Sequence, residues 1–129
     1  GYTNTKTNSG HYTLIGRQGA LCGNVSEADG DFHATEHAVV VYPKENVDSD
    51  WLFFFLEDMN LNQYATGVAQ PGLSVNNILS LNVKVPESPK TREELGKSLR
   101  EVQNKILKTR EMLQAMPKIK QAILDKYLK

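Results

Sequence analysis

The chain has 129 residues, 40% of them hydrophobic, and its 15 Lys and Arg balance its 15 Asp and Glu. A single cysteine, Cys22, excludes an intrachain disulfide and fits a reducing cytoplasm, and no run of about eighteen apolar residues is present to span a membrane. Residues 1–90 hold ten acidic and five basic side chains, whereas residues 91–129 hold five and ten, so the charge of the front part gives no support to nucleic-acid binding.

Short runs of alternating or β-branched residues predict several strands joined by turns. The chain begins at Gly1 rather than at Met, which favours a fragment or a processed product, and residues 1–10 are expected to form a loop. A polar connection at 16–19 offers two glycines for positive φ, and residues 27–31 form an expected acidic turn. The predicted strands are 12–15, 21–25, 37–42 and 81–85, the last two ending at Pro43 and Pro86.

Two short helices are expected between the strands. Asp48 or Asp50 can cap a helix from Trp51 to about Met59, whose aromatic cluster we place at the heart of the core. A loop punctuated by Gly and Pro follows at 64–72, and Ser74 can cap a single turn over 75–79.

The last third of the chain predicts one long amphipathic helix. Thr91 and Glu94 have the spacing of a capping box, with Pro89 just upstream. Apolar residues then recur at alternating steps of four and three, with Thr109 as the one polar position, which is the pattern of a coiled-coil seam. Pro117 predicts a kink or a break before a second amphipathic segment. The seam consists of Leu95, Leu99, Val102, Ile106, Leu113 and Met116.

No pattern in the sequence argues for catalysis or for a metal site. The three histidines, His11, His33 and His37, and Cys22 match no metal-ligand spacing, and Cys22 is better explained as a small buried hydrophobe than as a nucleophile. The acidic pairs at 29/31 and 57/58 are more simply explained as turns and exposed helix ends. No phosphate-binding loop or dinucleotide fingerprint is present.

Two polar loops are the candidate recognition sites. Arg17 and Gln18 lie between glycines, and such side chains can bond guanine and adenine edges respectively. The second loop, 64–74, presents Tyr64, Thr66, Gln70 and Ser74 without a charged residue. From spacing alone, ordinary turns explain both loops better than recognition does, although polar loops on a rigid scaffold are where recognition sites usually lie.

An ordered set of segments resembles the DNA-specificity domain of type I restriction-modification specificity subunits. Related domains are fused to adenine methyltransferases. The match covers about residues 12–129, and its most specific parts are the Gly-x-x-Gly turn, the a-x-G-x-a-Q-x-x-L-S stretch and the step from Pro86 into the heptad helix. The segments are IGRQGALCGNV at 15–25, HATEHAVVVYP at 33–43, LFFFL at 52–56, ATGVAQPGLSVNNILSLNVKVP at 65–86 and IKQAILDKYL at 119–128.

The resemblance implies an α+β fold. A mostly-β recognition globule at 1–88, lacking its first strands, precedes a helical spacer at 89–129 that pairs with a second helix of the same kind. It further implies sequence-specific binding of double-stranded DNA without catalysis in this chain. S-adenosylmethionine would bind an associated DNA methyltransferase subunit or domain, beside a possible restriction subunit, in the cytoplasm. The DNA contacts we expect are Lys6, Asn8, Arg17, Gln18, Tyr64, Thr66 and Gln70.

A different class of function is compatible with the same residues. The heptad helix can serve a non-catalytic adaptor or dimerisation module that binds another protein, or a second copy, without touching DNA. DNA binding and its salt dependence separate the two interpretations, because phosphate contacts make affinity fall steeply with salt.

Overall fold

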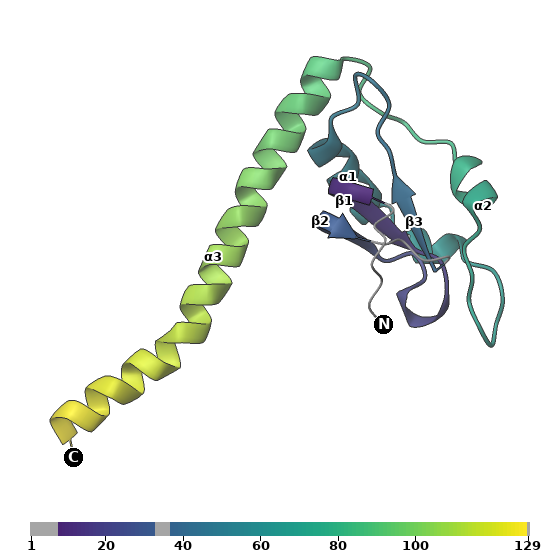
Figure 1. Ribbon diagram of the computed structural model, residues 1–129. Helices are drawn as coiled ribbons and strands as arrows, with labels where there is room; N and C mark the ends of the chain where they lie inside the picture. Colours follow the sequence, from purple (N-terminus) through teal and green to yellow (C-terminus); the bar gives the residue numbers. More distant parts are fainter. Residues whose placement is uncertain (1–7, 33–36, 129) are drawn as a thin grey trace.

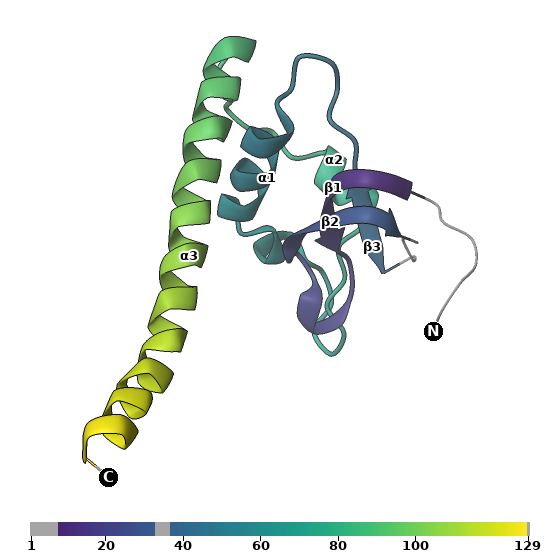
Figure 2. The same ribbon diagram turned by 60° about the vertical axis from the view of Figure 1, so that its left-hand side comes forward.

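The computed structural model describes residues 8–32 and 37–128. They form a globule, residues 8–88, and one long helix that projects from it (Figure 1). The globule combines a small antiparallel sheet with short helices, so the predicted α+β class is confirmed. The two ends of the long helix are in different surroundings: its first turns lie beside the globule, and its last turns do not (Figure 2).

The sheet places three strands in the order β2-β1-β3. The central strand is β1 (Asn8–Gly16), and it pairs antiparallel with both β2 (Val25–Phe32) and β3 (Ala38–Val41). The predicted strand at 37–42 is therefore confirmed as β3, and the predicted strand at 12–15 is the second half of a longer one. Residues 8–10, expected in a loop, belong to β1 instead.

The expected acidic turn at 27–31 is wrong, because these residues lie within β2. Glu27 is paired with Thr13, and Gly30 with Gly10, both glycines having positive φ. The expected strand at 21–25 is also wrong. Residues Gly19–Leu21 form a turn of 3-10 helix (η1), closed by a hydrogen bond of 3.1 Å from the Cys22 amide to the Gly19 carbonyl. Acidic residues occur in β2 because partners far away in the sequence compensate their charge, as the site shows below.

The two short helices begin where the capping residues predict. In α1 (Ser49–Asp58) the carboxylate of Asp48 accepts a hydrogen bond of 2.9 Å from the Trp51 amide. In α2 (Val75–Leu79) the Ser74 hydroxyl accepts one of 3.0 Å from the Asn77 amide. These bonds satisfy amide groups that have no partner within the helix, so local chemistry fixes both starts.

The core is small and lies between the sheet and the loops. Ile15, Cys22, Leu61 and Leu73 form a cluster in which no side chain is more than 2% exposed. Cys22 is thus a buried hydrophobe, as predicted. The aromatic run of α1 is not the centre of this cluster. Trp51 and Phe53 are buried, while their two Phe neighbours at 54 and 55 are half-buried.

The expected strand at 81–85 is wrong, since this segment is extended but forms no ladder with a described strand. Its side chains Leu81, Val83 and Val85 instead line an apolar cavity of about 330 Å³ against α1. The alternation of apolar and polar residues at 81–85 therefore reflects one face of the segment turned toward α1, rather than a strand in a sheet.

The long helix, α3 (Pro89–Leu128), has 40 residues. It begins at Pro89, whose missing amide hydrogen is tolerated in the first turn, so the predicted cap at Thr91 is wrong. The Ser88 hydroxyl accepts a hydrogen bond of 3.4 Å from the Thr91 amide instead. Pro117 does not break the helix, and the axis bends over its final third, the part that contains Pro117 (Figures 1 and 2). No helix within residues 8–32 and 37–128 is both long and apolar enough to cross a membrane.

Candidate nucleic-acid interface

Main-chain hydrogen bonds bring the two predicted recognition loops side by side. The Leu73 amide donates to the Arg17 carbonyl at 2.8 Å, and the Gly19 amide donates to the Pro71 carbonyl at 3.0 Å. The Arg17 amide in turn donates to the carbonyl of His37, which directly precedes β3, at 2.9 Å. Residues 16–19, 66–72 and His37 therefore form one connected surface, which we call the loop surface.

The segment 66–72 is a closed hairpin loop. Thr66 and Gly72 exchange two main-chain hydrogen bonds of 2.8 Å. Gly67 has φ +97°, and a Cβ there would lie 2.9 Å from the Gln70 carbonyl oxygen, so glycine is required at this turn. The turn leaves Val68 fully exposed at the tip. A loop fixed in this way presents its side chains at defined positions.

Side-chain contacts orient two of the predicted contact residues. The Arg17 Nε donates to the Leu73 carbonyl at 3.3 Å. Gln18 Oε1 lies 2.7 Å from His37 Nδ1, which lies outside the set of contact residues predicted from the sequence. Its position before β3 gave no signal for this role, because only the fold brings it next to residue 18.

The predicted contact residues do not all lie together. Arg17, Gln18, Thr66 and Gln70 belong to the loop surface, and Tyr64 ends the short 3-10 helix η2 (Leu61–Tyr64) just before it. Asn8 begins β1, so the length of that strand separates it from the loops at the other end. Lys6 lies outside the described residues.

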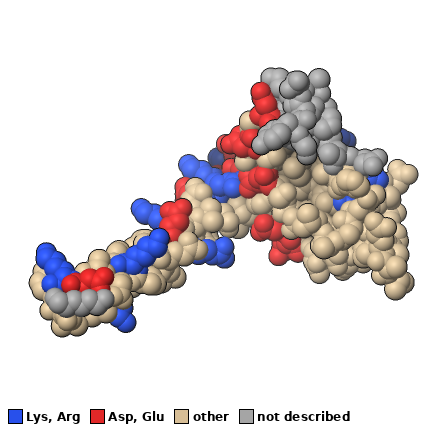
Figure 3. Space-filling model, turned by 60° about the horizontal axis from the view of Figure 1, so that its bottom comes forward, with Lys and Arg blue, Asp and Glu red and all other residues tan. Residues whose placement is uncertain are grey.

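Charge divides the globule into two ends. No Asp, Glu, Lys or Arg occurs from Met59 to Val83, which includes the 66–72 hairpin and α2. Figure 3 shows this end of the globule almost entirely tan, with the acidic side chains gathered toward α3. The loop surface therefore carries no acidic side chain of its own that would repel a phosphate backbone.

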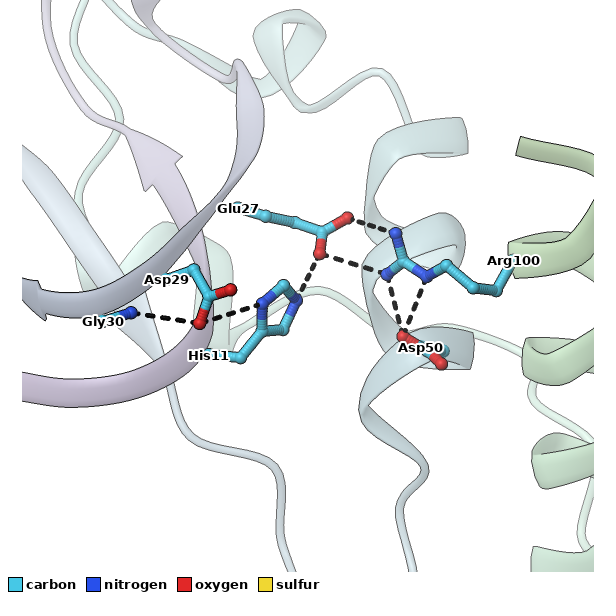
Figure 4. A network of polar contacts seen from close by, with 6 residues as sticks. All are labelled: His11, Glu27, Asp29, Gly30, Asp50 and Arg100. Carbon is cyan, nitrogen blue, oxygen red and sulfur yellow. Dashed lines mark hydrogen bonds and ion pairs between the residues drawn. The ribbon is translucent and has the colours of Figure 1, made fainter. Parts of the chain in front are cut away.

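One arginine holds two of the acidic side chains that lie toward α3. Arg100 of α3 binds Glu27 of β2 through two hydrogen bonds of 2.9 and 3.1 Å, and Asp50 of α1 through two more of 2.8 and 3.1 Å (Figure 4). Its guanidinium carbon also lies 5.0 Å from the ring centroid of Phe54. The hydrogen bond to Glu27 raises the pKa of Arg100, and the bond to Asp50 adds to this against the opposing effect of burial.

Histidine continues this network toward the sheet. His11 Nε2 contacts the Glu27 carboxylate, and His11 Nδ1 lies 3.9 Å from Asp29 Oδ1 (Figure 4). Among residues 8–32 and 37–128, no group of three or more His, Cys, Asp or Glu side chains has the geometry of a metal site. His33 falls outside these ranges.

The predicted heptad seam of α3 is open in the single chain. Its six apolar side chains are between 41% and 60% exposed. Leu99 differs from the rest because it also lines a groove with Trp51, Phe54 and Phe55 of α1. The hydroxyl of Thr109, the polar position in the seam, donates to the Lys105 carbonyl of its own helix at 2.8 Å.

The described residues thus combine a globule that has a polar loop surface with a long helix whose apolar seam is open. The model of the type I restriction modification DNA specificity domain matches residues 1–127, and the chain belongs to this family. It is 54% identical, over 86 residues, to the Escherichia coli protein named type I restriction enzyme EcoprrI specificity subunit. That match covers 67% of this chain and 21% of the relative, so the matched part of the chain spans about a fifth of the relative's length.

Proposed function

We propose that the loop surface recognises base edges of double-stranded DNA for a type I restriction-modification system. The observation that carries this proposal is the joining of residues 16–19 and 66–72 by main-chain hydrogen bonds. They place Arg17, Gln18, Thr66 and Gln70 on one surface that carries no acidic side chain. Arginine and glutamine are the side chains that bond guanine and adenine through paired contacts. Family membership supports the same assignment.

The test selects duplexes that bind the chain from a random pool and then measures their affinity over a range of salt. We expect a preferred sequence, and an affinity that falls steeply as salt rises. Arg17→Ala should weaken binding of the selected duplex by roughly 5- to 150-fold, the value of a base contact of about 1–3 kcal/mol. Lys44→Ala removes the same charge from an exposed residue beyond the other end of β3, and it should keep the sequence preference. Equal binding of all duplexes would contradict the proposal.

The reaction chemistry belongs, in this proposal, to associated subunits. A DNA methyltransferase subunit or domain would bind S-adenosylmethionine, and a restriction subunit would cut, while this chain supplies the sequence recognition in the cytoplasm. The relative's name, a specificity subunit of a restriction enzyme, supports this division of labour. Co-purification with a methyltransferase, whose methylation site changes when Arg17 or Gln70 is replaced, tests it. Methylation at an unchanged site would contradict it.

The open seam of α3 supports a second part of the proposal, that α3 pairs with another helix. Six apolar side chains at heptad spacing remain 41–60% exposed, and the Thr109 hydroxyl already has a partner in its own helix, so an apolar interface need not leave it unsatisfied. Pairing of two copies is the simplest form. Pairing of two copies is also expected in the alternative function, in which the chain is a dimerisation or adaptor module that does not bind DNA.

Light scattering tests the pairing. We expect a dimer that becomes a monomer when Val102 and Ile106 are changed to Asp. Asn104→Asp adds a charge about 200° round the helix from Val102, off the seam, and should leave the dimer intact. A wild-type chain that stays monomeric at high concentration would contradict self-pairing and would direct the search to a helix of another subunit.

A further inference from the structure

The first three turns of α3 contact the globule through one stripe of the helix. Arg92, Gly96 and Arg100 are spaced by four residues, so they lie above one another on the same face. Gly96 is the one buried residue within the described span of α3. From residue 104 onward every described residue except Leu124 is exposed. The stripe is therefore where the helix and the globule are joined.

Gly96 brings the two backbones into direct contact. A Cβ at this position would lie 2.3 Å from Asp48 Oδ2 and 2.6 Å from the Trp51 amide nitrogen. Asp48 caps α1, and its carboxylate already bonds that amide, so the neighbouring atoms cannot move aside without disturbing the start of α1. No other residue type permits this approach.

The two arginines hold the helix on either side of Gly96. Arg92 donates to the carbonyl oxygens of Asn46 at 3.0 Å and Glu87 at 3.1 Å, and it also bonds the Pro86 carbonyl. Arg100, two turns on, bonds a carboxylate of β2 and one of α1 at once (Figure 4). Contacts at three levels of the helix oppose tilting, and the two divergent carboxylates at Arg100 oppose rotation about the helix axis.

We propose that Arg92, Gly96 and Arg100 form a rigid joint that fixes the direction in which α3 leaves the globule. The joint thereby positions the loop surface relative to the exposed distal part of α3. The positioning of DNA by this joint rests on the proposed function, whereas the rigidity of the joint does not. These residues are positioning residues, because none of them belongs to the loop surface.

Distances between spin labels measured by pulsed electron resonance test the joint. One label is placed by Asn76→Cys on α2 and the other by Lys118→Cys on distal α3, both exposed positions, while Cys22 is buried and escapes labelling. With the labelled chain diluted into an excess of unlabelled chain, so that only distances within one chain are measured, we expect one narrow distance distribution in the wild-type background. Arg100→Ala should at least double its width, and Gly96→Ala should shift its mean. Arg110→Ala, on the exposed part of α3, should change neither the width nor the mean. Arg100→Lys should give a width between those of the wild type and Arg100→Ala.

A second distance separates positioning from binding. With a label on one end of the selected duplex and one at Lys118→Cys, Arg100→Ala should broaden the distribution while changing duplex affinity by less than about twofold. A variant that loses affinity but keeps a narrow distribution would overturn the joint and indicate a merely structural role. An unchanged width between the Asn76 and Lys118 labels in a folded Arg100→Ala chain would overturn it as well. If no duplex binds at all, the proposed function fails, and the distance within the chain still tests the joint.

Discussion

The proximal and distal parts of α3 have the same heptad pattern but different surroundings. Up to Gln103 the helix lies beside α1, with Arg100 reaching β2, and beyond it the helix projects from the globule (Figures 1 and 2). The distal part, 104–128, carries six Lys and Arg against two Asp and Glu and is open on all sides except at Leu124. The contacts with the globule are made mainly by the joint, with Leu99 of the seam beside it. The heptad pattern of α3 therefore identifies a free apolar face of the helix, not the face that packs against the globule of the same chain.

Among the substitutions that distinguish the proximal from the distal part of α3, Gly96→Ala should change the free energy of unfolding most. In an exposed helix this change stabilises by about 1 kcal/mol, because alanine is the better helix former. At the joint the added methyl group meets the start of α1, and we expect the chain to lose about 2–3 kcal/mol of unfolding free energy through overpacking. Denaturant unfolding measures the change in unfolding free energy, and its sign alone distinguishes the loss expected at the joint from the gain expected in an exposed helix. A gain in stability would mean that α3 does not lie against α1.

Arg100→Ala should have the next largest effect, a loss of about 2 kcal/mol, because it leaves two partly buried carboxylates without their charged donor. Arg110→Ala, in the distal part, should stay within about 0.5 kcal/mol of the wild type. Denaturant unfolding of both variants measures the difference between the two parts of the helix. Equal losses for the two would contradict the joint.

The same pair of variants gives a pH test. The pKa of Arg100 is raised in the folded chain. Its contribution to the free energy of unfolding is therefore complete below the pKa of the unfolded chain, and it is lost only as pH rises through the pKa of the folded chain. Both lie far into the alkaline range, so the loss caused by Arg100→Ala should be the same at roughly pH 7 and pH 9. A loss that disappears between these two pH values would show that another group is responsible.

Much of the fold could be predicted where the determinants are local. The capping side chains Asp48 and Ser74 form hydrogen bonds within three residues, so both short helices begin as expected. The strand β2 could not be predicted, because Glu27 is compensated by Arg100, which is 73 residues away. The segment 81–85 alternates like a strand, and sequence alone cannot say that its apolar face meets a helix.

The smallest difference in stability is expected between substitutions of two leucines of the seam, which occupy equivalent heptad positions. Leu99 lines the groove with α1, and Leu113 is in the distal part. Leu99→Gln should cost about 1 kcal/mol, because it removes a half-buried apolar side chain from the groove. Leu113→Gln should change stability by less than about 0.5 kcal/mol at concentrations where the chain is monomeric. Thermal unfolding at low concentration measures both, and a larger cost at Leu113 would reverse the comparison.

The candidate site was predictable in part for the same reason. The polar character of Arg17, Gln18, Thr66 and Gln70 was visible in the sequence, but their meeting depends on bonds between Arg17 and Leu73, which are 56 residues apart. His37 joins them only through the fold. The joint left one local signal, a glycine inside a strong helix with an arginine four residues before and after it. Its meaning depends on α1 lying opposite.

The length of α3 gives the joint a mechanical consequence. The helix continues beyond Arg100 to Leu128, a lever arm of about 40 Å at about 1.5 Å per residue. A rotation of about ten degrees at the joint therefore moves the far end by about 7 Å, or two steps of about 3.4 Å along a DNA strand. A small change in packing beside Gly96 therefore produces a much larger displacement at the far end of α3, so the position of the distal part of this helix depends on packing at its first turns.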